Sequence, residues 1–222
     1  MLPDRLTLID ETNRGDHRYL DAADKCYFFG EYFAGKGYQG GGTNQLIFNF
    51  KCKPTAAASN PARHGHKDRA IQTIAAGLRG VFAKDSAERI TWIPIPPSKA
   101  EDDADYDDRL LRTLNAAFAG YNVDVRAVLQ QSKSTGSDHN SSGDRISPEA
   151  LFAVTEVNRS TLASKAMHSY VFLFDDVLTT GKHFKCCERR LREVLPAHTQ
   201  ITGLFVARRV VPNPFAEPEV LE

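Results

Sequence analysis

Two adjacent aspartates followed by a hydroxyl-rich turn are the residues of this 222-residue chain whose types and spacing best predict chemistry. Asp175 and Asp176 end the apolar run "VFLF", and "VLTTG" follows them directly. Residues 179–181 supply hydroxyl groups and a glycine backbone that a ligand can approach closely. If a helix begins near Lys182, its first N–H groups and its dipole point at the same place. The pattern therefore predicts a phosphate site.

The carboxylates before this turn suit the sugar end of a sugar phosphate. Carboxylate oxygens accept hydrogen bonds from hydroxyl groups and are ligands that Mg²⁺ prefers. We therefore expect Asp175 and Asp176 to bind the hydroxyls of a ribose, directly or through magnesium, with its 5-phosphate at the turn. The alternative is an ordinary strand that ends in acidic residues and a loop, and the rest of the chain has to decide.

The surrounding residues predict the elements that position this pattern. Apolar residues recur at helix-face spacing over residues 68–83. The sequence "RITWIPIP" predicts a buried strand that ends before Pro97, which has no N–H to continue a ladder. The same reasoning predicts helices over 105–119 and 182–195, and strands over 123–129, 151–157, 168–176 and 199–210.

Alternation of strands and helices from residue 68 onward predicts an α/β fold, with a mainly parallel sheet flanked by helices. Ligands bind at the carboxyl ends of the strands in such sheets. Two of these ends carry the polar sequences of interest, "IPIPPSK" at residues 93–99 and "LFDDVLTTGK" at 173–182. Their shared position favours a binding site over an ordinary loop.

Residues outside this alternation are less regular. Residues 1–65 mix aromatic residues with glycines, and "LIFNFKC" at 46–52 is predicted to be a short strand. The three glycines at 40–42 predict a turn. Residues 130–149, rich in Ser, Gly, Asp and Asn, predict a long mobile loop that serves as a lid or a binding loop.

The composition predicts a soluble globular protein, with 41% hydrophobic and 25% charged residues. Lys plus Arg and Asp plus Glu number 28 each, so no charge bias favours a nucleic-acid partner. No stretch approaches the roughly 18 apolar residues of a membrane-spanning helix, and "MLPDRLTLIDETNRGD" has acid where a signal peptide is apolar. We therefore expect a cytoplasmic protein without a membrane partner, and a homodimer stays open.

The four cysteines form no C-x-x-C pair of the kind that marks a zinc site. The adjacent pair at 186–187 is poorly placed for a disulfide, which favours reduced thiols in a reducing compartment. A zinc site built from Cys26 and Cys52 with His64 and His66 is the weaker alternative, since a polar loop explains these histidines better.

The strand-end sequence "VFLFDDVLTTGK" resembles the phosphoribosyl-pyrophosphate signature of the type I phosphoribosyltransferases. "WIPIPPSK" resembles the family's pyrophosphate loop, and "QSKSTGSDHNSSGDRISPEALFAV" lies where its flexible catalytic loop belongs. "NQLIFNFKCKP" before a long helix is most similar to the ComF-like, competence-associated branch. The resemblance covers residues 44–210. It implies a type I phosphoribosyltransferase-like fold with an N-terminal hood lobe at 1–65, a core at 66–212 and a frayed tail at 213–222.

The resemblance also implies roles for individual residues. The aspartate pair would contact the ribose and hold Mg²⁺, the loop at 98–99 would face the pyrophosphate, and the flexible loop would close over the site. The implied catalytic residues are Asp175, Asp176, Lys99, Lys133 and Arg145. The implied ligands of 5-phosphoribosyl 1-pyrophosphate (PRPP) are Ser98, Lys99, Asp175, Asp176, Val177, Leu178, Thr179, Thr180, Gly181 and Lys182.

The implied reaction is magnesium-dependent transfer of a phosphoribosyl group from PRPP to a small nitrogenous acceptor, with release of pyrophosphate. One alternative is a regulatory protein that binds PRPP without turnover. Two departures from the family pattern favour it. The loop "SDHNSSGDR" supplies only Arg145 as an arginine, and Lys182 and His183 replace the small residues usual after the glycine. A competence or DNA-processing accessory is a third possibility, which the neutral charge disfavours. Aromatic residues between positions 27 and 38 would stack on an acceptor base or form the core of the N-terminal lobe.

Overall fold

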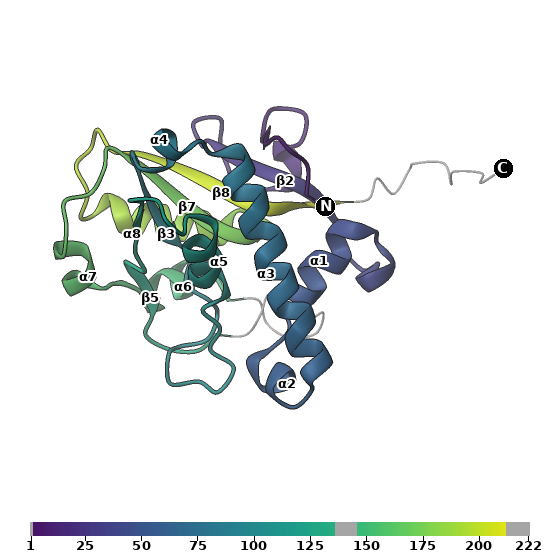
Figure 1. Cartoon of the computed structure of the whole chain (residues 1–222). Coiled ribbons are helices and arrows are strands. Elements are labelled where there is room, and N and C mark those ends of the chain that lie inside the picture. Colours follow the sequence, from purple (N-terminus) through teal and green to yellow (C-terminus); the bar gives the residue numbers. More distant parts are fainter. Residues whose placement is uncertain (1, 136–145, 212–222) are drawn as a thin grey trace.

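A computed structural model describes residues 2–135 and 146–211, and a six-stranded sheet forms its centre (Figure 1). The strand order is β1-β2-β8-β7-β3-β4, and every neighbouring pair is parallel except β1 with β2. The strands are β1 (Thr7–Leu8), β2 (Cys26–Phe33), β3 (Ile90–Pro94), β4 (Asp124–Val125), β7 (Tyr170–Leu178) and β8 (Gln200–Val210). The predicted α/β fold with a mainly parallel sheet is confirmed.

Helices cover both faces of this sheet (Figure 1). The long helix α3 (Pro61–Val81) packs on one face with α1 (Gly42–Phe50) and α5 (Arg109–Ala117). Helix α8 (Lys182–Arg192) packs on the other face. The predicted helices at 68–83, 105–119 and 182–195 therefore exist, with α3 beginning seven residues earlier because Pro61 follows the capping side chain of Asn60.

Alternation along β7 explains how one strand serves two cores. Val171 and Leu173 face the core that contains α8, whereas Phe172 and Phe174 face the core that contains α3 and α5. Successive side chains of a strand point to opposite faces, so a run that is apolar throughout is buried on both sides. The sequence "VFLF" is therefore a central strand of the covered sheet.

The aspartate pair lies within β7, which continues beyond the predicted end at residue 176 as far as Leu178. Asp175 is opposite Phe205 in the register with β8, and Val177 is opposite Ala207. The backbone ladder on both sides of the pair fixes where the carboxylates point. The turn at residues 179–181 then leads into α8.

One predicted strand is wrong, and another exists only over residues 155–157. Residues 46–52 lie mostly in helix α1, where Ile47 and Phe50 are buried three residues apart while Phe48 is 62% exposed. Residues 151–157 begin in helix α6 (Pro148–Val154), because Ser147 caps its first turn by accepting a hydrogen bond from the Ala150 amide. Both segments are dense in apolar residues, which strand and helix share, and neither alternates strictly.

Short elements complete the described part of the chain. The predicted strand over 123–129 is divided into β4 and a separate strand, which pairs antiparallel with residues 155–157 in a two-stranded sheet. The remaining elements are β5 (Leu129–Gln131), β6 (Thr155–Val157), α2 (Pro54–Ala58), α4 (Lys84–Ala87), α7 (Arg159–Ala163) and two 3₁₀ turns, η1 (Arg14–Asp16) and η2 (Gly37–Gln39).

The sheet extends into the N-terminal segment. Strand β2 pairs in parallel with β8 from Cys26 opposite Gly203 to Phe33 opposite Val210. The first strands of the chain therefore complete one edge of the central sheet, and the boundary of a separate lobe at residue 65 stays a prediction. Within residues 2–135 and 146–211, no helix combines the length and apolarity needed to cross a membrane.

Candidate functional site

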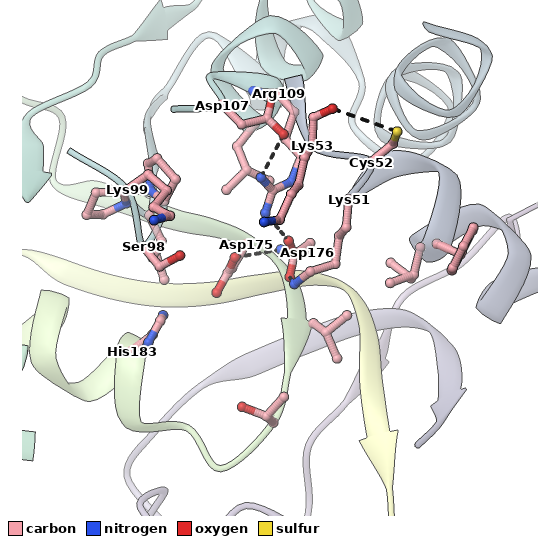
Figure 2. A pocket seen from close by; sticks show the side chains of 18 of the residues that line it. Lys51, Cys52, Lys53, Ser98, Lys99, Asp107, Arg109, Asp175, Asp176 and His183 are labelled. Atoms are coloured by element: carbon pink, nitrogen blue, oxygen red, sulfur yellow. Dashed lines mark hydrogen bonds and ion pairs between the residues drawn. The ribbon is translucent and has the colours of Figure 1, made fainter. Parts of the chain in front are cut away.

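A cavity of about 670 Å³ lies at the carboxyl ends of β3 and β7 (Figure 2). Its floor is formed by the end of β7 and the turn that follows, and one side by the loop after β3. The C-terminal end of α1, the connection to α2 and the first turns of α3 form another side. A volume of this size accommodates a small organic ligand.

Asp176 is a fixed anion in this cavity. Its Oδ1 accepts a hydrogen bond from Lys51 Nζ at 2.9 Å and its Oδ2 accepts one from Arg109 Nη2, while only 3% of the residue is exposed (Figure 2). Burial opposes the charge, but the Lys51 ammonium and the Arg109 guanidinium outweigh it and hold the pKa of Asp176 well below its usual range. Both of its oxygens are therefore engaged by protein cations.

Asp175 has a different environment although it is the neighbouring residue. Its carboxylate lines the cavity and accepts a hydrogen bond of 2.7 Å from the backbone amide of Asp176. Burial and the negative charge of Asp176 raise the pKa of Asp175. Asp175 is therefore the member of the pair whose protonation responds to a ligand or a metal ion.

Asp176 belongs to a largely buried cluster of five charged side chains. Arg109 donates to Asp107 Oδ2 at 3.0 Å as well as to Asp176, and Lys67 Nζ lies 2.6 Å from the same Asp107 oxygen. Lys67 also donates to the backbone carbonyl of Cys52, next to Lys51. We call Lys51, Lys67, Asp107, Arg109 and Asp176 the ion cluster. It joins α1, α3, the start of α5 and β7 at the edge of the cavity.

The turn after β7 requires glycine at one position. Gly181 has φ of +82°, and a Cβ there would lie 2.8 Å from two side-chain carbons of Leu20. Gly181 is the N-cap of α8 and, as a glycine, supplies no capping side chain of its own. Thr179, Gly181 and His183 all line the cavity, with the His183 ring directed toward it (Figure 2).

The loop after β3 brings a second cationic group to the cavity. Lys99 Nζ lies 3.0 Å from Asp103, which also accepts a hydrogen bond from Ser134 at 2.8 Å. Hydrogen bonds from the Asp105 amide, Ser134 and Lys99 lower the pKa of Asp103 to about 2. The Ser98 carbonyl accepts a hydrogen bond of 2.7 Å from the Thr135 amide, so residues 132–135 are fastened to this loop.

Most of the residues implicated by sequence meet at this cavity. Eight of them line it, which are Ser98, Lys99, Asp175, Asp176, Val177, Leu178, Thr179 and Gly181. Thr180 and Lys182 do not line it, and the buried Lys182 donates to the Ile146 carbonyl at 2.7 Å. Lys133 is exposed and lies outside the lining, and Arg145 falls outside the described residues.

Sequence reasoning missed Lys51, Asp107 and Arg109. Lys51 belonged to a predicted strand and the other two to a predicted helix, so no spacing rule joined them to the aspartate pair. A sequence signal for these residues does exist: they are charged and stand at the ends of helices that pack near the carboxyl end of a strand. This signal is weak because most charged residues at such ends are solvated.

The aromatic residues of the N-terminal segment divide between the core and the cavity. Phe29 and Phe28 are each buried in one of the two cores, as expected if these rings serve packing and do not stack on an acceptor. Tyr32 and Phe48 line the cavity, and the Phe48 ring meets that of Tyr38 edge to face at 5.7 Å. An aromatic wall therefore lies on the α1 side of the cavity.

The residues at the cavity fit a magnesium ion that is shared with a ligand. Within residues 2–135 and 146–211 no group of three or more His, Cys, Asp or Glu side chains is arranged to hold a metal. Asp175 offers carboxylate oxygens, whereas those of Asp176 are engaged by Lys51 and Arg109. Because Mg²⁺ commonly binds through one or two carboxylates plus substrate phosphates and water, the donor set suits an ion that arrives with a phosphorylated ligand.

The four cysteines are free thiols, and three of them are buried. Cys52 is the half-buried one and lines the cavity between Lys51 and Lys53.

No protein-family model, curated protein or solved structure matches this chain, so the cavity itself is the basis for assigning a function.

Proposed function

We propose that the chain is a phosphoribosyltransferase that uses PRPP and Mg²⁺ and transfers the phosphoribosyl group to a small nitrogenous acceptor. The observation that carries the proposal is the meeting of three segments in one cavity: the loop with Ser98 and Lys99, the carboxylate of Asp175, and the turn at residues 179–181. These segments match, in order, a pyrophosphate, a ribose and a 5-phosphate. The type I phosphoribosyltransferase fold is part of the same proposal.

The charges of the cavity suit a ligand with two phosphate ends. The turn at residues 179–181 and the start of α8 would hold the 5-phosphate, because backbone N–H groups and the positive end of a helix favour anions. Lys99 would leave Asp103 to bind the pyrophosphate, which carries more charge than one carboxylate. Asp175 would accept hydrogen bonds from the ribose hydroxyls, and Lys51 and Arg109 would keep Asp176 from repelling the ligand.

The transfer replaces one bond at the anomeric carbon by another. The bond from this carbon to the pyrophosphate oxygen breaks, the bond to the acceptor nitrogen forms, and the sugar gains positive charge between the two events. Lys99 stabilises the departing pyrophosphate, and the Asp175 carboxylate stabilises the positive ring. Bound Mg²⁺ would supply further charge neutralisation on the pyrophosphate oxygens, with Asp175 as its protein ligand.

A regulatory protein that binds PRPP without turnover is the second candidate. It is favoured by the ion pair of Lys99 with Asp103, because a cation already engaged in the ligand-free protein needs an exchange of partners before it acts. Lys133 also lies outside the cavity lining, although the resemblance implies that it closes over the site. Both candidates share the PRPP pocket and differ only in pyrophosphate release.

Calorimetry with PRPP and MgCl₂, followed by a pyrophosphate-release assay with a panel of nitrogenous bases, tests both candidates. We expect saturable binding in the micromolar range, and loss of most of it in Asp175→Asn. The exposed Asp102→Asn is the matched control, since it removes the same charge from the neighbouring loop outside the cavity lining. Absence of PRPP binding at millimolar concentration rejects both candidates. Binding without release for every acceptor selects the regulatory one.

A further inference from the structure

An N-terminal segment to which the sequence assigns no role wraps behind the phosphate turn. Residues 9–24, which we call the strap, connect β1 to β2. His17 Nδ1 donates a hydrogen bond to the carbonyl of Thr179, and the Tyr19 amide donates one of 3.0 Å to the carbonyl of Thr180. Two successive carbonyls of the turn are therefore held by the strap.

The geometry of the peptide bond fixes what happens on the other side of the turn. In a trans peptide the C=O and the following N–H point in opposite directions, and the structure contains no cis peptide bond within its described residues. The Thr179 carbonyl points to His17, so the Thr180 N–H points away from it. The Thr180 carbonyl points to Tyr19, so the Gly181 N–H also points away from the strap.

The side away from the strap is the cavity. Thr180 itself is not part of the lining, but Thr179 and Gly181 on either side of it are, whereas His17 is fully buried and neither it nor Tyr19 contributes to the lining. Neither the Thr180 N–H nor the Gly181 N–H has a hydrogen-bond partner among residues 2–135 and 146–211. Successive unpaired N–H groups with one orientation form an anion-binding concavity.

We infer that His17 is a positioning residue for the sugar-phosphate site: by holding the Thr179 carbonyl it aims the Thr180 and Gly181 N–H groups at the phosphate. The inference rests on the proposed function. His17 touches no ligand and acts through the backbone of the turn. Its Nε2 is buried and has no partner in the described part of the chain, so the single hydrogen bond of the ring is the one to Thr179.

Further contacts attach the strap to the elements that flank the turn. Asp24 lies 2.6 Å from Lys185 in the first turns of α8, and Asp16 lies 2.9 Å from Arg208 at the end of β8. Leu20 fills the space beside Gly181 that a larger residue would need. The strap is thus held on both sides of the point where His17 acts, and its position is defined by more than one bond.

The test compares two variants of His17 and two ligands. His17→Asn keeps an N–H donor close to the position of Nδ1, whereas His17→Leu fills the site without a donor. The ligands are ribose 5-phosphate, which needs the turn, and inorganic pyrophosphate, which needs Lys99. Arg18→Ala is the matched control, because Arg18 is the exposed neighbour on the strap.

We expect His17→Leu to weaken the binding of ribose 5-phosphate at least about tenfold, because about one hydrogen bond to a charged group is lost. The affinity for pyrophosphate should change less than about twofold. His17→Asn and Arg18→Ala should stay within about threefold of the unmodified protein for both ligands. Equal weakening of both ligands in His17→Leu, or none, overturns the inference. Binding of neither ligand by the unmodified protein rejects the proposed function and this inference with it.

A second measurement does not depend on whether His17→Leu folds. Amide resonances of the unmodified protein are followed during titration with inorganic phosphate. The Thr180 and Gly181 protons should shift downfield and saturate together, because both N–H groups donate to the same anion. Saturation by phosphate without a shift of either amide overturns the inference, even where the affinity data agree with it.

Discussion

Replacing either member of the aspartate pair by asparagine removes one carboxylate at nearly constant volume, yet the structure predicts opposite effects on stability. In Asp176→Asn, the Lys51 ammonium and the Arg109 guanidinium lose their shared anion in a buried place. Breaking a buried ion pair from one side costs about 3–5 kcal/mol. The asparagine carbonyl still accepts one hydrogen bond, so we expect a loss of about 3 kcal/mol.

In Asp175→Asn, the folded protein loses a carboxylate that burial and Asp176 disfavour. A carboxyl group whose pKa is raised by one unit costs the folded state about 1.4 kcal/mol above that pKa. We therefore expect a gain of about 1 kcal/mol or more in the free energy of unfolding at pH 7.5. For a chain of this length, the melting temperature should rise by about 2–4 °C in Asp175→Asn and fall by about 6–12 °C in Asp176→Asn.

The two effects should also depend on pH in different ways. A raised pKa in the folded state lowers stability as the pH rises from the unfolded value of about 3.9 through the folded one, so the gain in Asp175→Asn should appear only above about pH 4. The depressed pKa of Asp176 stabilises the fold above about pH 3.9, and this contribution is lost as the pH falls toward the folded value. The deficit of Asp176→Asn should therefore shrink in acid.

Urea denaturation of both variants and the unmodified protein between pH 3.5 and 8 measures these differences. A shift of both variants in the same direction at pH 7.5 would refute the division into one fixed and one responsive carboxylate. So would a gain in Asp175→Asn that is as large at pH 3.5 as at pH 8. Because both variants should bind PRPP more weakly, the stability data separate the two roles where binding data do not.

Other expectations follow from the same cavity. In urea titrations, Gly181→Ala should lower the free energy of unfolding by about 1–3 kcal/mol, because of the positive φ of residue 181 and its contact with Leu20. The same variant should bind ribose 5-phosphate more weakly. Gly80→Ala, in open space on α3, is the control and should be neutral or stabilising. Lys99→Ala should weaken pyrophosphate binding about tenfold in calorimetry and leave ribose 5-phosphate nearly unchanged; equal losses would contradict the assignment of the two phosphate ends. Mg²⁺ alone should give no saturable heat at millimolar concentration, and should tighten PRPP binding when both are present. Iodoacetamide should modify Cys52 first, and bound PRPP should slow this reaction, as peptide mapping by mass spectrometry can show.

The parts of the fold that were predictable from sequence are those with an unambiguous period. Strand β7 contains four consecutive apolar residues, and helix α8 has an apolar face with helical spacing. Both elements lie close to their predicted positions. Residues 46–52 were not predictable in the same way, because Phe48 is an exposed aromatic inside a short apolar stretch. Its exposure removes the helical period and leaves only composition, which favours a strand.

The candidate site was predictable where it is local in sequence. Asp175, Asp176 and the turn are consecutive, so one motif contains them. The partners of Asp176 were not predictable, since Lys51 lies 125 residues and Arg109 lies 67 residues away along the chain. Which cation reaches a buried carboxylate depends on how α1 and α5 pack over the sheet, and the period of an amphipathic helix gives no information about the charged residues at its ends.

The ion cluster has a consequence for how quickly ligands arrive. It contains three cations and two carboxylates, so the cluster has one excess positive charge at the edge of the cavity, which the Asp175 carboxylate offsets only while it is ionised and free of Mg²⁺. A charge inside a concave, partly dry site attracts anions over a range set by the Debye length, about 8 Å at physiological ionic strength. Association of a polyphosphorylated ligand should therefore slow as salt is added, even though the molecule as a whole neither attracts nor repels it.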